Sequence, residues 1–457
     1  MAQKPSIPKG TRDFSPEQVV KRNYIMDVLK SRFTSYGFQP IETPSFENAQ
    51  TLMGKYGEEG DRLIFKILNS GDFLSKVAPE LLASKNSAKI TSSITEKALR
   101  YDLTVPFARY VVQNQNDITF PFKRYQIQPV WRADRPQRGR FREFYQCDAD
   151  VVGSDSLWQE VELIQLYDDA FTALNLKGVN IKLNNRKILT GIAQVIGAAD
   201  KLIDFTVALD KLDKLGQEGV KNEMRTKGIS DAAIDKLQPL FGLSGSAEQQ
   251  LGQLRSLLSA SEQGLKGIEE LTFIVDAITA LGLQSAKLSI DVTLARGLDY
   301  YTGAIFEVEA PSGVAMGSIG GGGRYDDLTG IFGLKGVSGV GVSFGLDRIY
   351  LVMDELGLFP VTVSVQPSVL FINFGPDEAL YALKAIKSLR ALGVASELYP
   401  DSAKMAKQMS YANKRNIPYA ALAGSDEMTD QTFTLKNMVS GEQQVVGLKA
   451  LTDIVKG

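Results

Sequence analysis

The sequence predicts an α+β fold in which a β-rich domain is interrupted by helices and followed by a small α/β domain. Segments rich in aromatic and β-branched residues, which favour strands, occupy 98–153 and return at 287–345. Residues from about 190 to 286 carry leucine, lysine, aspartate and glutamate at helical spacing. After Pro360, short apolar segments alternate with amphipathic ones, which is typical of an α/β domain.

The first elements expected along the chain are a helix and an extended segment. Apolar side chains recur at helical spacing over 17–36, and Gly37 follows as a C-cap glycine would. The segment 38–47 is interrupted by Pro40 and Pro44, so we expect it at the edge of a sheet or at an interface.

A hairpin is predicted next. The segments 122–134 and 141–153 are expected to form antiparallel strands around the polar loop RPQRGR. Further on, 337–356 reads as a strand that runs into a helix. For the glycine run 320–323, a tight turn or bulge and a close approach of backbone to a ligand are equally compatible with the sequence.

The C-terminal part is expected to form a small, mostly parallel α/β domain. Helices are predicted up to about residue 391 and over 402–415. The predicted strands are 369–374, 395–400, 419–424, 432–437 and 443–448.

Composition excludes several classes of function. The net charge is −2, so contact with nucleic acid has to rest on local basic patches. The chain has no histidine and one cysteine, Cys147, which excludes serine–histidine and cysteine–histidine nucleophile pairs and disfavours a zinc site. No apolar run reaches the roughly 18 residues of a membrane span and no secretion signal is evident, so we expect a cytoplasmic protein with no membrane segment.

Five arginines lie between Trp131 and Asp148. Arginine pairs with phosphate through two hydrogen bonds and keeps its charge at working pH. On a strand, Arg140, Arg142 and Phe144 point to one face, which places a ring for base stacking beside the charges. The plain alternative is a solvated face of the sheet. The number of arginines around one hairpin favours a site for a nucleoside polyphosphate.

Two further segments carry candidate residues with equally plain alternatives. LARGLDYYTGAIFE places Arg296 before a turn-like Gly-Leu-Asp and two tyrosines, which suit either a polar ligand or a core. Arg348 in FGLDRIY fits a surface salt bridge on a helix as well as a ligand. Neither a P-loop nor a Rossmann glycine fingerprint is present, so neither phosphate cradle applies.

Together these segments resemble class II aminoacyl-tRNA synthetases and, within that class, the histidyl-tRNA synthetase family. The motifs that carry the resemblance are IPKGTRDFSP, LRYDLTVPFARY, RGRFREFYQCDADVVG, RGLDYY, GGRYDDLTG and VGVSFGLDR. The resemblance implies a class II antiparallel sheet core in 1–190 and 287–358, a helical insertion domain at 191–286 and an anticodon-binding domain at 366–457. It also implies ATP with Mg²⁺, L-histidine and tRNA(His) as ligands, and a homodimer.

The resemblance assigns the arginine cluster to ATP. The implied ATP-binding residues are Arg132, Arg140, Arg142, Phe144 and Arg348. Arg132, on the α-phosphate, and Arg296, which would bridge the α-phosphate and the carboxylate of histidine, are the implied catalytic residues. Because that carboxylate is already ionised, activation needs positioning and charge stabilisation rather than a protein base.

The resemblance assigns a second group of residues to the amino acid. The implied histidine-binding residues are Asp102, Thr104, Gln146, Asp150, Arg296, Tyr300, Tyr301 and Tyr325. The α-amino group would contact Asp102, Thr104 and Gln146. The two imidazole nitrogens would contact Asp150 and Tyr301.

Two other classes of function stay open at this point. One is a catalytically inactive, regulatory relative of the synthetases, which the presence of 366–457 and Arg296 disfavours. The other is a tRNA-sensing module without chemistry, which has no need of the arginines. Histidine-dependent exchange of pyrophosphate into ATP separates both from an enzyme.

Overall fold

The computed structural model divides the chain into two compact units, Met1–Pro360 and Val361–Gly457. It describes residues 4–75, 77–295, 300–364 and 366–456. The predicted catalytic residue Arg296 therefore lies outside the described residues.

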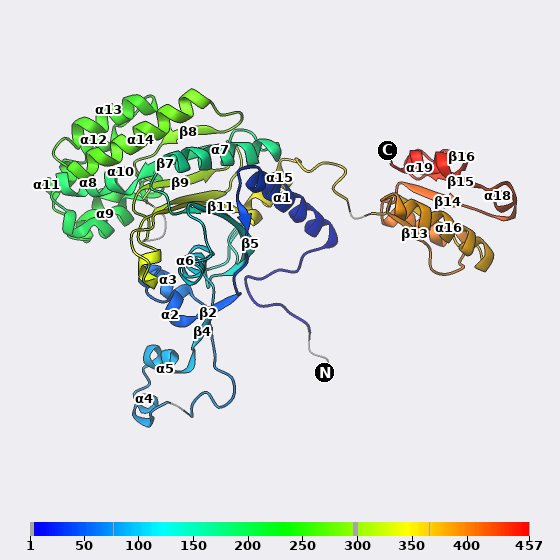
Figure 1. Cartoon of the computed structure of the whole chain (residues 1–457), viewed down its shortest axis with the longest axis horizontal. Helices are drawn as coiled ribbons and strands as arrows, with labels where there is room; N and C mark the ends of the chain where they lie inside the picture. Colours follow the sequence, from blue (N-terminus) through cyan, green and yellow to red (C-terminus); the bar gives the residue numbers. More distant parts are fainter. Residues whose placement is uncertain (1–3, 76, 296–299, 365, 457) are drawn as a thin grey trace. The chain divides into compact units, whose positions relative to one another are not determined.

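An eight-stranded sheet forms the centre of the first unit (Figure 1). Pairing is antiparallel from β5 across to β7, and only the two outermost pairings, β1 with β5 and β7 with β8, are parallel. In spatial order the strands are β1 (Gln39–Pro40), β5 (Phe122–Trp131), β6 (Glu143–Val152), β11 (Gly339–Gly345), β10 (Gly320–Tyr325), β9 (Ala304–Glu309), β7 (Asn180–Asn185) and β8 (Lys287–Ile290). The predicted antiparallel core is confirmed.

Side-chain alternation gives this sheet one apolar and one polar face. On β6, Cys147, Ala149 and Val151 are buried in the main hydrophobic core together with residues of the covering helices. These helices are α1 (Pro16–Ser35), α7 (Trp158–Ala173) and α15 (Leu346–Glu355). Gln146 and Asp148, at the alternate positions, point to the opposite face, where the candidate site lies.

A buried ion pair fixes α7 to the sheet. Arg324 on β10 donates two hydrogen bonds to the Glu160 carboxylate, at 2.5 and 2.6 Å, and the side chains are only 4% and 0% exposed. A bidentate pair of this kind is geometrically specific, and removing one partner would leave a buried charge uncompensated.

The region that the sequence predicted as helical, 191–286, consists mainly of helices packed beside β7 and β8 (Figure 1). The helices are α8 (Arg186–Ile196), α9 (Leu202–Leu209), α10 (Leu212–Thr226), α11 (Asp231–Asp235), α12 (Gln238–Phe241), α13 (Ala247–Leu257) and α14 (Glu262–Leu281). Helices α8 and α14 approach each other closely at a pair of glycines: a Cβ on Gly191 would lie 2.5 Å from the Cα of Gly264.

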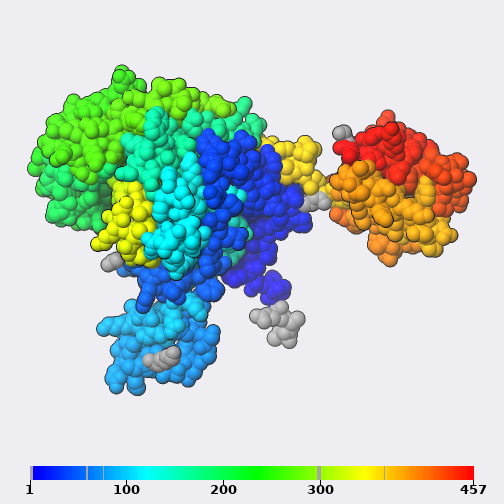
Figure 2. All heavy atoms as spheres, viewed as in Figure 1, coloured from blue at the N-terminus to red at the C-terminus, as the bar shows by residue number. Residues whose placement is uncertain are grey.

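A small three-stranded sheet and five short helices flank the polar face of the large sheet. The elements are β2 (Phe46–Asn48), β3 (Lys66–Ile67), β4 (Lys97–Leu99), α2 (Ala49–Leu52), α3 (Gly57–Leu63), α4 (Pro79–Ala83), α5 (Ser87–Ile94) and α6 (Thr104–Gln113). Helices α4 and α5 bury none of their side chains and form the light blue projection in Figure 2. By contrast, α6 is largely buried and positions the site.

The local predictions for the first unit are mostly confirmed. Helix α1 begins after a capping box formed by Ser15 and Gln18, and Gly37 follows it with φ of 80°. The segment 38–47 does supply the edge strand β1. The glycine run is part of the paired strand β10, which excludes the tight turn or bulge, one of the two alternatives that the sequence left open.

The placement of Arg140 and Arg142 on a strand is also wrong. Pairing of β6 begins at Glu143, opposite Trp131. The preceding residues form a turn in which Gly139 has φ of 70° and Arg140 pairs with Gln137 in an isolated bridge. Because the chain bends at Arg142 and β6 starts only at Glu143, the alternation that would have aligned the two arginines with Phe144 does not extend to them.

The second unit contains a five-stranded sheet with helices on its faces. The strands, in spatial order, are β13 (Ser396–Leu398), β12 (Val369–Phe371), β14 (Tyr419–Leu422), β15 (Thr432–Asn437) and β16 (Gln443–Gly447). The helices are α16 (Pro376–Ala391), α17 (Met405–Lys414), α18 (Ser425–Asp430) and α19 (Leu448–Lys456).

The prediction of a mostly parallel sheet in this unit is wrong. Strand β12 pairs in parallel with β13 and β14, whereas β14–β15 and β15–β16 are antiparallel. The reason is the length of the last connections, because residues 438–442 are too few for the crossover that a parallel pair requires.

We expect Gly322→Ala to destabilise the first unit by roughly 1–3 kcal/mol, since a Cβ there would lie 2.1 Å from the carbonyl oxygen of Gly341 on the paired strand. The matched control is Gly252→Ala in α13, where no atom lies within 4 Å and alanine should stabilise the helix by up to about 1 kcal/mol. Urea unfolding measures both. Equal effects of the two substitutions would contradict the close packing of β10 on β11.

Candidate active site

Two adjoining hollows lie on the polar face of the large sheet. The inner pocket is lined by Asp102, Thr104, Gln146, Asp148, Asp150, Tyr300, Tyr301, Gly321, Gly322, Tyr325, Gly341, Val342 and Ser343. The outer cleft has a volume of about 480 Å³, and its lining includes Arg132, Asp134, Arg140, Phe144, Glu307, Asp347 and Arg348. Gln146, Tyr301 and Ser343 line both, so the two hollows form one continuous site.

Asp102 lies two residues before α6 and is almost completely buried. Its carboxylate accepts hydrogen bonds from the hydroxyls of Tyr56, at 2.8 Å, and Tyr300, at 3.1 Å, and from the backbone N–H of Val105, at 3.2 Å. Burial raises the pKa of Asp102, and these hydrogen bonds oppose the rise. The carboxylate is thus held rigidly by the start of the helix and by two phenols.

Asp150 is paired with an arginine from the neighbouring strand. Nη2 of Arg124 on β5 lies 2.8 Å from Oδ2 of Asp150, and both side chains are essentially inaccessible to solvent. The hydroxyl of Tyr325 donates to Oδ1 at 2.7 Å. A Cβ on Gly341 would lie 2.0 Å from this oxygen, so the glycine leaves the space that the carboxylate occupies. Burial raises the pKa of Asp150, and Arg124 and Tyr325 oppose the rise.

Asp148 lacks the ion pair that Asp150 forms with Arg124. It is 2% exposed, and no ion pair to it is found among the described residues. Its carboxylate accepts a hydrogen bond from the Ser343 hydroxyl and lies 3.5 Å from Nε2 of Gln146. Burial, reinforced by Asp150, raises the pKa of Asp148 to about 7, although Arg124 opposes the rise.

Gln146 offers the inner pocket an unused acceptor. Its Oε1 atom is buried and has no hydrogen-bond partner among the described residues. Because an unpaired buried acceptor is costly, a donor supplied by a ligand would be favourable at this position. Thr104, at the start of α6, lines the same pocket.

The outer cleft carries the fixed positive charge. Nε of Arg132 donates to the carbonyl oxygen of Tyr101 at 2.9 Å, and its guanidinium lies 5.2 Å from the ring centre of Phe144. Nε of Arg348 donates to the carbonyl oxygen of Gly139 at 2.8 Å. These backbone contacts fix the two guanidinium groups at the cleft, and their positive charge suits an anionic ligand. Arg140 also lines the cleft and is about half exposed.

Arg142 does not line either hollow. Its side chain donates instead to the carbonyl oxygens of Asp134, at 3.1 Å, and Lys9, at 3.4 Å. Its backbone N–H donates to the carbonyl oxygen of Gly10. In this structure Arg142 fastens the N-terminal segment to the hairpin, and its contact with ATP stays a prediction.

Sequence reasoning missed three groups that shape the inner pocket: Arg124, Tyr56 and the role of Asp148. Asp148 had a signal, because strand alternation places it on the same face as Gln146 and Asp150. Arg124 could have been found only from the register of the hairpin, which sets it opposite Asp150. Tyr56 is the N-cap residue of α3, far along the sequence from the other pocket residues, and no sequence pattern pointed to it.

Comparison with known proteins shows the family of the chain. Residues 83–349 match the family model described as histidyl-tRNA synthetase, and 368–457 match that of the anticodon binding domain. The chain belongs to the histidyl-tRNA synthetase family. It is 69% identical to a protein of Christiangramia forsetii and 65% identical to one of Flavobacterium johnsoniae, each named histidine–tRNA ligase and each matched over 100% of both chains.

Solved structures of the histidyl-tRNA synthetase family agree with the fold. The crystal structure of histidyl-tRNA synthetase from Nostoc sp. PCC 7120 superposes with a TM-score of 0.83 at 30% identity, over 100% of this chain and 99% of that one. The alternative of an inactive relative is not supported, because full-length relatives at 69% and 65% identity carry the name of a ligase. Within the described residues, no helix combines the length and the apolar composition of a bilayer-spanning segment.

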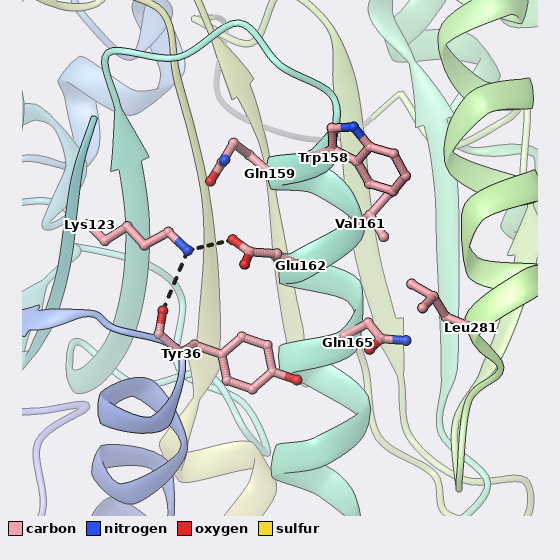
Figure 3. Close-up of a pocket in the computed structure, with 8 residues that line it drawn as sticks. All are labelled: Tyr36, Lys123, Trp158, Gln159, Val161, Glu162, Gln165 and Leu281. Atoms are coloured by element: carbon pink, nitrogen blue, oxygen red, sulfur yellow. Dashed lines mark hydrogen bonds and ion pairs between the residues drawn. The ribbon is translucent and has the colours of Figure 1, made fainter. Parts of the chain in front are cut away.

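Another hollow, beside α7, offers no comparable chemistry (Figure 3). Its ammonium group, Lys123 Nζ, already binds the Glu162 carboxylate and the carbonyl oxygen of Tyr36. The Tyr36 hydroxyl donates to Asp169 at 2.5 Å. The charged groups that line this hollow therefore satisfy each other, and we assign it no function.

Asp148→Asn should stabilise the ligand-free protein at pH 8. The folded-state pKa of Asp148, about 7, is above its ordinary value of 3.8, so the stability that the protonated form contributes is full below about pH 4 and is lost as the pH rises through 7. Asparagine abolishes this loss. We expect the variant to exceed the wild type by ~2 kcal/mol or more at pH 8, and by much less at pH 4.5.

Urea unfolding at both pH values measures the difference in the free energy of unfolding between variant and wild type. The control is Asp213→Asn, at an exposed position, for which we expect no such dependence on pH. A variant that is less stable than the wild type at pH 8 would show that Asp148 is stabilised as a carboxylate.

Proposed function

We propose that this chain activates L-histidine with ATP in the site formed by the inner pocket and the outer cleft, and transfers the histidyl group to tRNA(His). The observation that carries the proposal is the division of charge in one continuous site. Buried carboxylates line the inner end, and fixed guanidinium groups line the outer end. An amino acid with a cationic inner part, joined to an anionic nucleotide, is complementary to this arrangement.

In the inner pocket, Asp102 and Thr104 receive the α-ammonium group together with Gln146, whose Oε1 lacks a partner among the described residues. The imidazole ring lies deeper, among the acids of β6 and the phenols Tyr301 and Tyr325. Amino acids without ring nitrogens would leave these buried polar groups unpaired, which is the physical basis of specificity. Tyr300 closes this end by donating to Asp102.

In the outer cleft, Arg132 holds the α-phosphate, Arg348 and Arg140 hold the outer phosphates, and the Phe144 ring stacks on adenine. The carboxylate of histidine attacks the α-phosphorus and pyrophosphate leaves. Negative charge grows on the phosphate oxygens during the attack, and the preorganised guanidinium groups stabilise it. We assign Arg296 to stabilise the same charge, and this assignment rests on the sequence motif RGLDYY alone.

This reaction requires no titrating protein base. The attacking carboxylate is already ionised, so the absence of histidine from the chain is no obstacle. In the second step, the terminal ribose hydroxyl of tRNA attacks the carbonyl carbon, and the phosphate of the adenylate accepts the hydroxyl proton. AMP is then the leaving group, and no side chain has to act as a base.

The outer cleft suits Mg²⁺ that arrives with ATP. Magnesium is commonly held by phosphates and one or two carboxylates. Asp134, Glu307 and Asp347 line the cleft and are of the right chemical type. Among the described residues, no group of three or more metal-ligating side chains forms a site that would hold an ion by itself. The ion would therefore depend on the phosphates, whose charge it would offset.

The remaining assignments follow the family resemblance. We propose a catalytic core at 1–190 and 287–358, an insertion domain at 191–286, an anticodon-binding domain at 366–457, a cytoplasmic location and a homodimer. Light scattering tests the last assignment: a homodimer has twice the chain mass of 50.0 kDa, and a monomeric mass at micromolar concentration would contradict it.

Exchange of labelled pyrophosphate into ATP tests the proposed activation step. We expect exchange that depends on L-histidine and is not supported by the other standard amino acids. Exchange without histidine dependence, or none at all in protein that binds tRNA, would contradict the proposal.

Arg132→Ala should lower kcat for this exchange by a factor of about 100 or more, because it removes a preorganised donor from the charge that develops on the α-phosphate. The matched control is Arg138→Ala, from the same loop, whose guanidinium is 57% exposed and pairs with Glu355 at the surface. The control should change kcat less than threefold. Similar losses in both variants would show that the loop, rather than the charge at Arg132, matters.

A further inference from the structure

The N-terminal segment 8–14 contains the motif KGTRDF, to which the proposed function gives no task. This segment packs on the loop between β5 and β6, which carries Arg132 and Arg140. The backbone N–H of Arg142 donates to the carbonyl oxygen of Gly10 at 2.9 Å. Gly10 has φ of 88°, and a Cβ there would lie 2.8 Å from the Arg142 side chain, so the two backbones approach as closely as glycine allows.

Arg12 extends from this segment to two residues that line the outer cleft. Its Nη2 atom donates to Oδ1 of Asp347 at 2.6 Å, and its guanidinium carbon lies 3.2 Å from the ring centre of Phe141. Asp347 immediately precedes Arg348 in the first turn of α15. Phe141 immediately follows Arg140 in the loop. A single side chain therefore joins the two elements that carry the arginines of the cleft.

The Asp347 carboxylate is held by several groups at once. It is 4% exposed; Oδ1 also accepts from Arg22 on α1, and Oδ2 accepts from the backbone N–H of Tyr145 on β6 at 3.3 Å. The guanidinium of Arg22 in turn lies 4.1 Å from the ring centre of Phe14. Arg12, Arg22 and Asp347 together have a net charge of +1 when ionised, which favours an anion in the adjoining cleft. Asp347 is therefore poorly available to Mg²⁺.

A purely structural anchor is the plain alternative for Arg12, and the chain contains one for comparison. Lys21 on α1 binds the Asp354 carboxylate at 2.9 Å, about two turns further along α15 than Asp347. Helices α1 and α15 lie side by side, so this pair also fastens the N-terminal part of the chain to α15 (Figure 1). Neither Lys21 nor Asp354 lines the outer cleft. Arg12 differs in contacting both sides of the cleft, through a planar group that fixes their relative orientation.

We propose that Arg12 is a positioning residue for the reaction of ATP. It holds the loop 132–142 and the start of α15 at the separation at which the arginines of both elements reach the phosphates together. Arg12 acts through Phe141 and Asp347 and does not touch the nucleotide. This inference rests on the proposed function and deepens it. Because coupling between two sites is reciprocal, bound ATP should also stabilise the segment 8–14.

Pyrophosphate exchange separates positioning from anchoring. Arg12→Ala should raise the KM for ATP by a factor of about 10, the usual size of a coupling between sites. The KM for histidine should change less than about twofold, because Asp347 and Phe141 do not line the inner pocket. The matched control, Lys21→Ala, removes the other ion pair to α15 and should change both KM values less than about twofold.

A similar rise in the KM for ATP in both variants would overturn the inference, because loosening of α15 anywhere would then be sufficient. A KM for histidine that rises as much as the KM for ATP in Arg12→Ala would overturn it too, since the effect would not be confined to the outer cleft.

Limited proteolysis of the wild-type protein tests the coupling without any substitution. Trypsin cleaves after Lys9, which is exposed, and after Arg12. ATP with Mg²⁺ should slow cleavage at these two positions several-fold, measured by mass spectrometry of the N-terminal fragment. None of the residues 8–14 lines the outer cleft, so this protection would have to be transmitted through the loop and α15. Cleavage after the exposed Lys85, in the projection formed by α4 and α5, is the control for trypsin activity.

Equal cleavage after Lys9 and Arg12 with and without saturating ATP overturns the inference, even if Arg12→Ala fails to fold. The proposed function would survive that result, because histidine-dependent exchange in the wild type does not depend on it. Wild-type protein without such exchange is the separate result by which the proposed function fails.

Discussion

The site depends on one physical constraint, the burial of three carboxylates with the guanidinium of Arg124 on one face of an antiparallel sheet. Removing a carboxylate from water is favourable only when charge or hydrogen bonds replace the water. For Asp102 the replacement is two phenols and a backbone N–H, and for Asp150 it is Arg124. For Asp148 it is the Ser343 hydroxyl and the Gln146 amide, together with the nearby charge of Arg124.

The rest of the first unit holds this polar face in place. Apolar side chains on the other face pack under α1, α7 and α15, and the Arg324–Glu160 pair ties α7 to β10. Glycines on β10 and β11 remove side chains that would otherwise fill the pocket or, at Gly341, displace the Asp150 carboxylate. The charges are thus preorganised by strands rather than by loops, which reduces reorganisation during reaction.

The chemistry that such a site supports is electrostatic. The chain contains no histidine, and its inner tyrosines have raised pKa values, so proton transfer by these side chains near neutral pH is disfavoured. Activation of a carboxylate by ATP needs only positioning and charge stabilisation. Fixed guanidinium groups at the outer end and acids at the inner end supply both without a titrating base.

The sequence predicted much of this fold and site, and the misses have physical causes. Alternation in 141–153 predicted strand β6 and therefore the common face of Gln146 and Asp150. Motif resemblance brought together residues as distant as Asp102 and Arg348, which do line one continuous site.

Pairing across strands could not be read from the sequence with the same ease. The Arg124–Asp150 pair depends on register, and the antiparallel end of the second unit depends on how the short connection after β15 turns. Arg142 shows a different limit: its charge fitted a phosphate site, but it lies in a bend before β6, and its side chain donates to the carbonyl oxygens of Asp134 and Lys9.

A crystal structure of the protein with histidinol and ATP tests the central claim most directly. The account predicts the ammonium group between Asp102 and Gln146, the ring in the inner pocket among the acids of β6 and Tyr301, and the phosphates against Arg132 and Arg348. Nucleotide bound away from the outer cleft, or a ring that lies outside the inner pocket, would contradict it.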